Sequence, residues 1–401
     1  MITYTRPQHR DEFEIAVVCA LPLESDAVSL IFDEFWGDEG GHGLGRSAGD
    51  QNSYTNGRIG DHNVVLVHLP NMGKVSTAAA AAGLRSSYTR LKLAVLTGIC
   101  GGVPRLEGGK EIFLGDVIIS QAVVQYDLGR QYPEKFIRKD TTSDNLGRPN
   151  QDIRSLLASV QGEFGLNHLQ QQMLRTLDQI QNKTAGHHVV YTRPPPTEDV
   201  LLEPAYLHRH HDQYNCGCDD NAACNKAMDS SCLDLRCAEN SVLRRAHSGD
   251  SQSRDPRIFF GQVASGDTVM KSGERRDSIA REHNVIAFEM EGAGVWDQVP
   301  CLVVKGVCDY ADSHKNKVWQ PYAAAVAAAT TKALLGLYPR TDNLTQRSAA
   351  EDGRPPPVTN NFNSNGTGSQ YNNTGNGPQY NNTGGGNQFN GTNMTFGNFT
   401  R

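Results

Sequence analysis

The stretch FEMEGAGVW, residues 288–296, places two glutamates at the end of an apolar run and follows them with Gly-Ala-Gly. The preceding residues, VIAF, have the composition of a buried strand. A buried carboxylate is costly unless something binds it. Either the chain is exposed where Glu289 and Glu291 lie, or these carboxylates have a function. The surrounding sequence bears on this choice.

Apolar segments of strand length recur along the chain, and most are continuous rather than alternating. They are residues 14–20, 63–69, 93–99, 116–120, 258–264, 285–290 and 302–308. Helical patterns lie between them, at 23–35, 74–88, 166–180 and 320–338. Continuous apolar strands are typical of sheets covered on both faces. The pattern therefore predicts an α/β fold in which a central mixed sheet is flanked by helices.

Composition excludes several classes of partner. The formal net charge of −6 leaves no basic stripe for nucleic acid. No apolar run approaches the ~20 residues that a membrane-spanning helix needs. The first residues, MITYTRPQHRDEFE, lack the apolar region of a secretory signal. We therefore expect a cytoplasmic location, with neither nucleic acid nor membrane as a partner.

Carboxylates follow three of the predicted strands. Ligands of such sheets bind outside the carboxyl ends of strands, and Glu24, Glu291 and Asp309 lie at such ends. Roles in helix stability are also open to them, because a glutamate in a first helical turn complements the helix dipole and an aspartate often caps a helix. The three positions together favour a binding site.

Two other strand ends carry candidate ligand contacts. The turn TGICGGVP, residues 97–104, is rich in glycine, which permits close approach of the backbone to a ligand. It has neither P-loop nor Rossmann spacing. After the strand at 258–264, Val269 and Met270 are placed to face a flat aromatic ligand, although ordinary core packing explains them equally well.

Four motifs occur in a fixed order: GICGG (98–102), ASGDTV (264–269), FEMEGAG (288–294) and GVCDYAD (306–312). Together they resemble the purine nucleoside phosphorylase/nucleosidase superfamily. The nearest variant is the nucleosidase-like domain of filamentous fungi that is associated with NOD-like receptors. The resemblance covers about 12–338 and implies one nucleoside phosphorylase-like domain, to which we assign 12–340.

The resemblance implies cleavage of a nucleoside's N-glycosidic bond, with the chemical logic of glycoside hydrolysis. Asp309 would protonate or hydrogen-bond the purine N7. Glu291 would bind the ribose hydroxyls, with Met290 packed under the sugar and Glu289 assisting. The remaining substrate contacts would be Gly98, Ile99, Gly101, Val269, Met270 and Lys74.

Glu24 bears on the choice between hydrolysis and phosphorolysis. In the superfamily, phosphorylases hold phosphate with cations after the first strand and before the glycine turn, whereas nucleosidases place a glutamate that activates water. Here the first turn reads ALPLESDA, with Glu24 and no cation. We therefore predict hydrolysis. The alternatives are a phosphorylase and a catalytically silent nucleotide-binding scaffold.

The substrate's 5′ group stays open between adenosine, ATP and a thio-nucleoside. Some relatives hydrolyse ATP as defence effectors. A triphosphate would need cations, and the candidates are Lys74, Lys271, Arg275 and Lys315, each of which is also explained as a solvated surface charge. We expect no cofactor, and we expect the chain to form a homo-oligomer.

Residues 205–245 form a Cys/His-rich insertion. It contains Cys216, Cys218, Cys224, Cys232 and Cys237 beside His208, His210 and His211. A structural zinc site would order so polar a loop. Reduced thiols in a mobile lid, or occasional disulfides, are the alternatives. Because the spacing matches no standard zinc finger, the sequence assigns no metal ligand.

The C-terminal part divides into a linker, 341–359, and an Asn/Gly/Gln-rich segment, 360–401, which we expect to be disordered as a monomer. Gln370, Gln379 and Gln388 each precede an aromatic residue, with a period of nine residues. Such ladders suit cross-β stacking. The segment resembles the amyloid signalling motifs that couple fungal NOD-like receptors to effectors, which implies a possible role in immunity or cell death.

Overall fold

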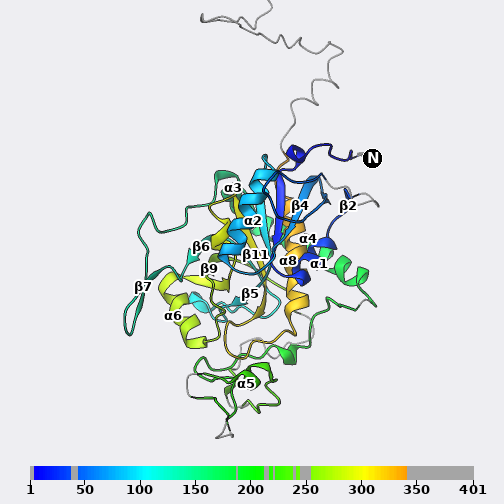
Figure 1. Cartoon of the computed structure of the whole chain (residues 1–401). Coiled ribbons are helices and arrows are strands. Elements are labelled where there is room, and N and C mark those ends of the chain that lie inside the picture. Colours follow the sequence, from blue (N-terminus) through cyan, green and yellow to red (C-terminus); the bar gives the residue numbers. More distant parts are fainter. Residues whose placement is uncertain are drawn as a thin grey trace, which may run out of the picture. The chain divides into compact units, whose positions relative to one another are not determined.

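The computed structural model describes residues 4–37, 44–186, 188–211, 216–219, 222–237, 241–243 and 254–340. It confirms the predicted α/β class, with a nine-stranded mixed sheet and helices on both of its faces (Figure 1). The predicted linker at 341–359 and the repeat segment at 360–401 lie outside the described residues.

Every predicted strand is present. The sheet contains β1 (Ile15–Cys19), β2 (Glu34–Phe35), β3 (Tyr54–Ile59), β4 (His62–His68), β5 (Leu93–Gly102), β6 (Val117–Gln125), β9 (Ile258–Ser265), β10 (Val285–Glu289) and β11 (Cys301–Asp309). Their order is β10-β9-β6-β11-β5-β1-β4-β3-β2. Strands β7 (Gly129–Gln131) and β8 (Phe136–Arg138) form a separate ribbon.

Strand β10 pairs on both of its edges. It runs parallel to β9 and antiparallel to the end of β5, where Phe288 lies opposite Gly101. Strands β10, β9, β6, β11 and β5 therefore close into a ring. This closure brings Glu289, which ends β10, and Glu291, which follows it, next to the glycine turn at the end of β5.

Helices cover both faces of the sheet, and a short one lies in the insertion at 205–245 (Figure 1). They are α1 (Pro22–Ser29), α2 (Lys74–Ser87), α3 (Gln151–Gln161), α4 (Glu163–Lys183), α5 (Asn225–Asp229), α6 (Gly273–His283), α7 (Gly292–Val295) and α8 (Gln320–Leu335), with 3-10 turns at Arg10–Glu12, Glu107–Gly109 and Pro196–Glu198. The helix predicted at 23–35 is wrong beyond Ser29. Pairing with β3 draws Glu34–Phe35 into the sheet as β2, and local helical pattern yields to that pairing.

The two faces of the sheet belong to different cores, which explains the continuous apolar runs. In β1, Ile15 and Val17 pack in the core that includes α1, α4 and α8, whereas Ala16 and Val18 pack with α2 and α7. Alternate side chains of a strand point to opposite faces. Both faces are therefore apolar.

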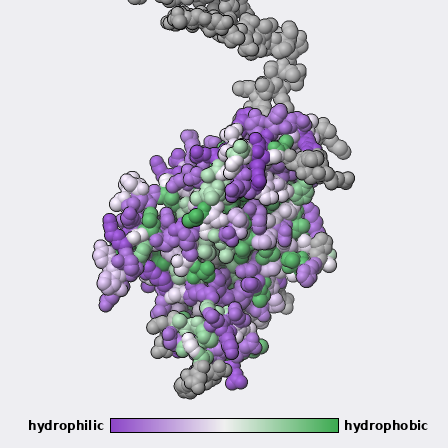
Figure 2. Space-filling model, in the orientation of Figure 1, coloured by the Kyte–Doolittle hydropathy of each residue, from purple (hydrophilic) through white to green (hydrophobic). Residues whose placement is uncertain are grey.

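Two helices show how deeply the first of these cores is buried. The helix predicted at 166–180 is present as α4, and Leu169, Met173, Leu177 and Ile180 on one of its faces are buried. Helix α8 is buried almost all round, between β5, β6 and β11 on one side and α1 and α4 on the other. On the face shown in Figure 2, hydrophilic side chains predominate and apolar ones are scattered among them. No helix of the described residues is long and apolar enough to cross a membrane.

Candidate active site

Glu24 is held at the start of α1, directly after β1. Pro22 begins the helix, and the buried Glu24 carboxylate accepts hydrogen bonds from the backbone N–H groups of Ala20 and Leu21 at Oε2, both at 2.9 Å. Its Oε1 accepts the N–H of Ile99, at 2.8 Å, from the end of β5. Burial raises the pKa of Glu24, while Lys305 and these hydrogen bonds oppose the increase. The carboxylate is therefore fixed between two strand ends and is more basic than usual.

Gly98 makes room for this carboxylate. A Cβ at residue 98 would lie 2.0 Å from Glu24 Oε1, which is closer than atoms can approach. The glycine in this turn thus accommodates a side chain of the protein itself.

Asp309 ends β11 next to Gly101 of β5. Its Oδ1 accepts the N–H of Ala311, at 2.8 Å, and its Oδ2 lies 3.3 Å from Lys315 Nζ. The thiol of Cys308 donates to Oδ2 at 3.4 Å, and burial raises the pKa of that thiol well above its usual value. A Cβ at residue 101 would lie 2.9 Å from Asp309 Oδ1 and 2.8 Å from the Cβ of Ala311.

The stretch FEMEGAGVW, residues 288–296, forms the end of β10 and contains α7. Glu289 Oε2 accepts the N–H groups of Glu291 and Gly292, at 2.9 and 2.8 Å. Glu289 Oε1 is buried and has no hydrogen-bond partner among the described residues. Burial, reinforced by the charge of Glu291, raises the pKa of Glu289. Both glutamates are buried.

Lys305 is a buried cation close to the carboxylates of Glu24, Glu289 and Glu291. We did not predict this residue as part of the site. The side chain is 1% exposed, in the middle of β11, and its Nζ lies 3.1 Å from Glu291 Oε2. Burial disfavours its charge, but Glu291, Glu24 and Glu289 together raise the pKa of Lys305 above its usual value. The signal was a lysine inside the apolar run LVVKGVC.

A cavity of about 230 Å³ joins these side chains. It is lined by Glu24, Ile99, Gly101, Val269, Met270, Glu289, Met290, Glu291 and Asp309 among the predicted site residues, and by Lys315 among the predicted cations. Residues that we did not predict also line it, including Met72, Phe288, Cys308 and Gln320. A larger cavity of about 440 Å³, beside Arg276 and Ile286, contains none of the predicted site residues.

Two predicted contacts do not line the cavity, namely Gly98, which faces Glu24, and Lys74. The Nζ of Lys74, at the start of α2, lies 2.6 Å from Asp127 and 3.6 Å from Asp267. Of the cations suggested for a polyphosphate, Lys271 and Arg275 are also absent from the cavity lining.

A family profile covers most of the chain. The profile described as the Phosphorylase superfamily matches residues 14–336. The chain belongs to this superfamily. The superfamily predicted from four short motifs is thereby confirmed.

Relatives of this phosphorylase-superfamily chain include nucleosidases. A nucleotide-binding leucine-rich repeat (NLR)-like protein of Hyaloscypha variabilis is 31% identical over 81% of this chain. The chain spans only 29% of that relative. A 5′-methylthioadenosine/S-adenosylhomocysteine nucleosidase of Mycobacterium bovis is 22% identical over 81% of this chain and 96% of its own length.

Among solved structures, a Helicobacter pylori 5′-methylthioadenosine/S-adenosyl homocysteine nucleosidase is similar, with a TM-score of 0.46 and 14% identity. It covers 81% of this chain and 98% of its own.

Proposed function

We propose that this chain hydrolyses the N-glycosidic bond of a purine nucleoside or nucleotide. The observation that carries the proposal is the cavity where Glu24, Glu291 and Asp309, from three separate strand ends, face one space. Cleavage of a glycosidic bond needs an acid at the leaving group and a base for water. The nucleosidase names of several relatives support the same chemistry.

Glu24 acts as the general base in this scheme. Its three backbone hydrogen bonds hold the carboxylate in place, and burial raises its pKa toward the working range of a base. Water gives its proton to Glu24 as its oxygen attacks the anomeric carbon.

Asp309 acts at the leaving base. Its carboxyl group hydrogen-bonds the purine N7 and donates its proton there, so that the base takes the electron pair of the breaking C–N bond and leaves as a neutral molecule. Lys315 and the N–H of Ala311 hold Asp309 in place from two sides. The apolar side chains of Met270 and Phe288, which also line the cavity, provide surfaces for the flat purine.

Glu291 and Glu289 bind the ribose. The ion pair with Lys305 holds Glu291, and the two N–H groups on Glu289 Oε2 hold that side chain. Glu289 Oε1 has no protein partner in the described structure, so it is available to a sugar hydroxyl.

Hydrolysis is favoured over phosphorolysis by the charges at the cavity. Four carboxylates line it, whereas Lys315 is the lining cation and is engaged with Asp309. A phosphate dianion is repelled by a surplus of negative charge. A neutral water molecule is not repelled by these charges.

The identity of the substrate's 5′ group is a second, more specific part of the proposal. The candidates remain adenosine, ATP and a 5′-thioether nucleoside. Lys315 alone of the four suggested cations lines the cavity, while Met72, Val269 and Met270 offer apolar contacts there. This composition supports a substrate with a small or apolar 5′ group more strongly than a triphosphate.

The test is release of adenine from adenosine, methylthioadenosine and ATP, each with and without phosphate, followed by chromatography. Release without phosphate is the expected result. Release only with phosphate would place the chain among the phosphorylases. If no substrate releases adenine while calorimetry detects nucleoside binding, the non-catalytic scaffold is the correct function.

We also propose that the chain acts as an effector that assembles through its repeat segment, 360–401. The NLR-like name of one relative and the nine-residue repeat support this. Full-length protein should form thioflavin-positive fibres, and a variant lacking 360–401 should not. Fibres of equal yield from both proteins would contradict the assignment of the motif.

A further inference from the structure

Histidine and cysteine side chains of the insertion gather into two clusters. The first contains His210, Cys216, Cys218 and Cys224, and the second contains His208, Cys237 and His314; within each, the possible ligand atoms lie within 4.8 Å of one another. The residues of the two clusters are interleaved in the sequence, because His208 belongs to the second cluster and His210 to the first. Their spacing in sequence therefore resembles no single zinc finger.

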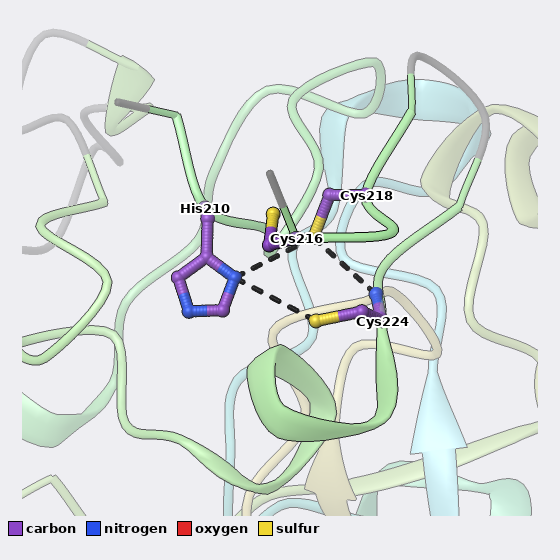
Figure 3. Close-up of side chains that lie close together, drawn as sticks. All are labelled: His210, Cys216, Cys218 and Cys224. Carbon is purple, nitrogen blue, oxygen red and sulfur yellow. Dashed lines mark hydrogen bonds between the residues drawn. The ribbon is translucent and has the colours of Figure 1, made fainter. Parts of the chain in front are cut away.

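The first cluster has the dimensions of a tetrahedral metal site. His210 Nδ1 lies 3.6 Å from Cys218 Sγ and 3.6 Å from Cys224 Sγ (Figure 3). A nitrogen and a sulfur bound to one zinc ion at tetrahedral angles are about 3.6 Å apart, given bond lengths of about 2.05 and 2.3 Å. Cys216 completes a set of three thiols and one imidazole.

In the second cluster, His208 Nδ1 lies 3.5 Å from Cys237 Sγ. Cys232, which is outside the three-residue cluster, adds a fourth candidate ligand, because its Sγ also lies 3.5 Å from His208 Nδ1. The other nitrogen of that ring lies 2.9 Å from the carbonyl oxygen of Ser230. A carbonyl on one ring nitrogen fixes the tautomer that leaves the other nitrogen able to bind a metal. His208 is thus oriented with Nδ1 toward the thiols.

His314 supplies an independent observation at this second cluster. Its side chain is only 7% exposed, and its Nε2 is buried with no hydrogen-bond partner among the described residues. A buried polar atom without a partner is unusual and indicates a missing ligand. Its Nδ1 lies instead toward Ser313 and Asp312, at 3.5 and 3.9 Å.

Neither disulfides nor free thiols in a mobile lid account for the insertion as well as a metal does. Disulfides do not join Cys218, Cys224, Cys232 or Cys237. Ala227 and Leu235 are the buried apolar side chains among the described residues of 205–245. Such a segment needs another source of order. Reduced thiols in a mobile lid would not be expected to converge on two imidazoles at tetrahedral spacing.

We propose that the chain binds two zinc ions, one through His210, Cys216, Cys218 and Cys224, and one through His208, Cys232, Cys237 and His314. Thiolate and imidazole sets of this kind select zinc and leave no position open for catalysis. The second ion ties the insertion to the loop that follows Asp309, where the N–H of His208 already donates to Ser313 Oγ at 3.0 Å.

The test is the zinc content of the purified full-length chain, measured by mass spectrometry after dialysis. About two zinc ions per chain are expected, as for two closed four-ligand sites. Cys218→Ser and His314→Ala should each lose about one ion, and the double variant both. His211→Ala is the matched control, because this exposed histidine of the same segment belongs to neither cluster.

Cobalt provides a second readout that does not depend on variants folding. Chain reconstituted with Co²⁺ should show the thiolate charge-transfer and visible bands of tetrahedral sites. Zinc well below one ion per chain, with no such bands, would overturn the proposal. About one ion, lost in the variants of one cluster only, would refute the other site. None of these readouts requires that the chain be a nucleosidase.

Discussion

The candidate active site and the insertion hold polar side chains together by different means. At the sheet, Glu24, Glu289 and Asp309 are fixed by backbone N–H groups at strand ends, and the apolar core on both faces fixes those strands. Among the described residues of the insertion, few apolar side chains are buried, and histidine and cysteine side chains lie close together instead. A large core can therefore hold charges at strand ends, whereas a segment without a core needs cross-links.

Removal of Lys305 should produce the largest effect and would test the sheet side of this comparison. Lys305→Met leaves Glu291 buried without its partner, and breaking a buried pair in this way costs about 3–5 kcal/mol of unfolding free energy. Urea denaturation measures the loss. Adding Glu291→Gln should recover much of the stability but none of the base release. A single variant as stable as the wild type would show that the carboxylates do not depend on this ammonium.

Asp309→Asn should reduce base release at least about a hundredfold, because the leaving base loses its proton donor. The substitution preserves shape, so the thermal unfolding temperature should change little. Steady-state kinetics with the best substrate measures the effect. Near-normal turnover would exclude Asp309 as the acid.

The pH profile should show Glu24 as the base. Below its pKa the carboxyl is protonated and cannot accept a proton from water, so kcat/KM should rise with pH through that value. Because burial raises the pKa of Glu24, the midpoint should lie above the usual 4.5. Glu24→Gln should lower activity about a hundredfold and remove this limb. Glu289→Gln, which changes a carboxyl group with a raised pKa in the same cavity, should retain it.

Gly98→Ala tests how closely the backbone fits the carboxylate. The new methyl group would overlap Glu24 Oε1, so we expect a loss of about 1–3 kcal/mol in unfolding free energy and roughly tenfold in kcat. Gly147→Ala is the control, because nothing lies within 4 Å of a Cβ there. Equal effects of the two substitutions would show that the fit around Glu24 does not matter.

Removal of metal should produce the smallest global effect and test the insertion side. Treatment with a chelator should leave far-UV circular dichroism and the main unfolding transition nearly unchanged, since the sheet has its own core. Limited proteolysis within 205–245 should accelerate roughly tenfold or more, as local opening becomes easier. If the sheet unfolds together with the insertion, the two regions are not independent.

Much of the fold could be predicted because the seven strands with continuous apolar runs each carry a local signal. Continuous apolar runs predicted β1, β4, β5, β6, β9, β10 and β11, and the ends of these runs placed Glu24, Glu291 and Asp309 at strand ends. The strands β2, β3, β7 and β8 were not predicted. In β2, pairing with β3 overrides a helical pattern.

The sequence by itself determined the class of fold and the superfamily, since these depend on local periodicity and short motifs, and it supplied the candidate residues for glycosidic chemistry. Only the tertiary structure decided which groups each charged or polar side chain contacts. In the sequence, Lys305 is an isolated charge within an apolar strand. In the structure, the ring of strands places Glu291 beside it as an ion-pair partner. His314 lies far along the chain from His208, yet their rings are 5.4 Å apart. Such encounters depend on chain closure over long separations, which no local pattern encodes.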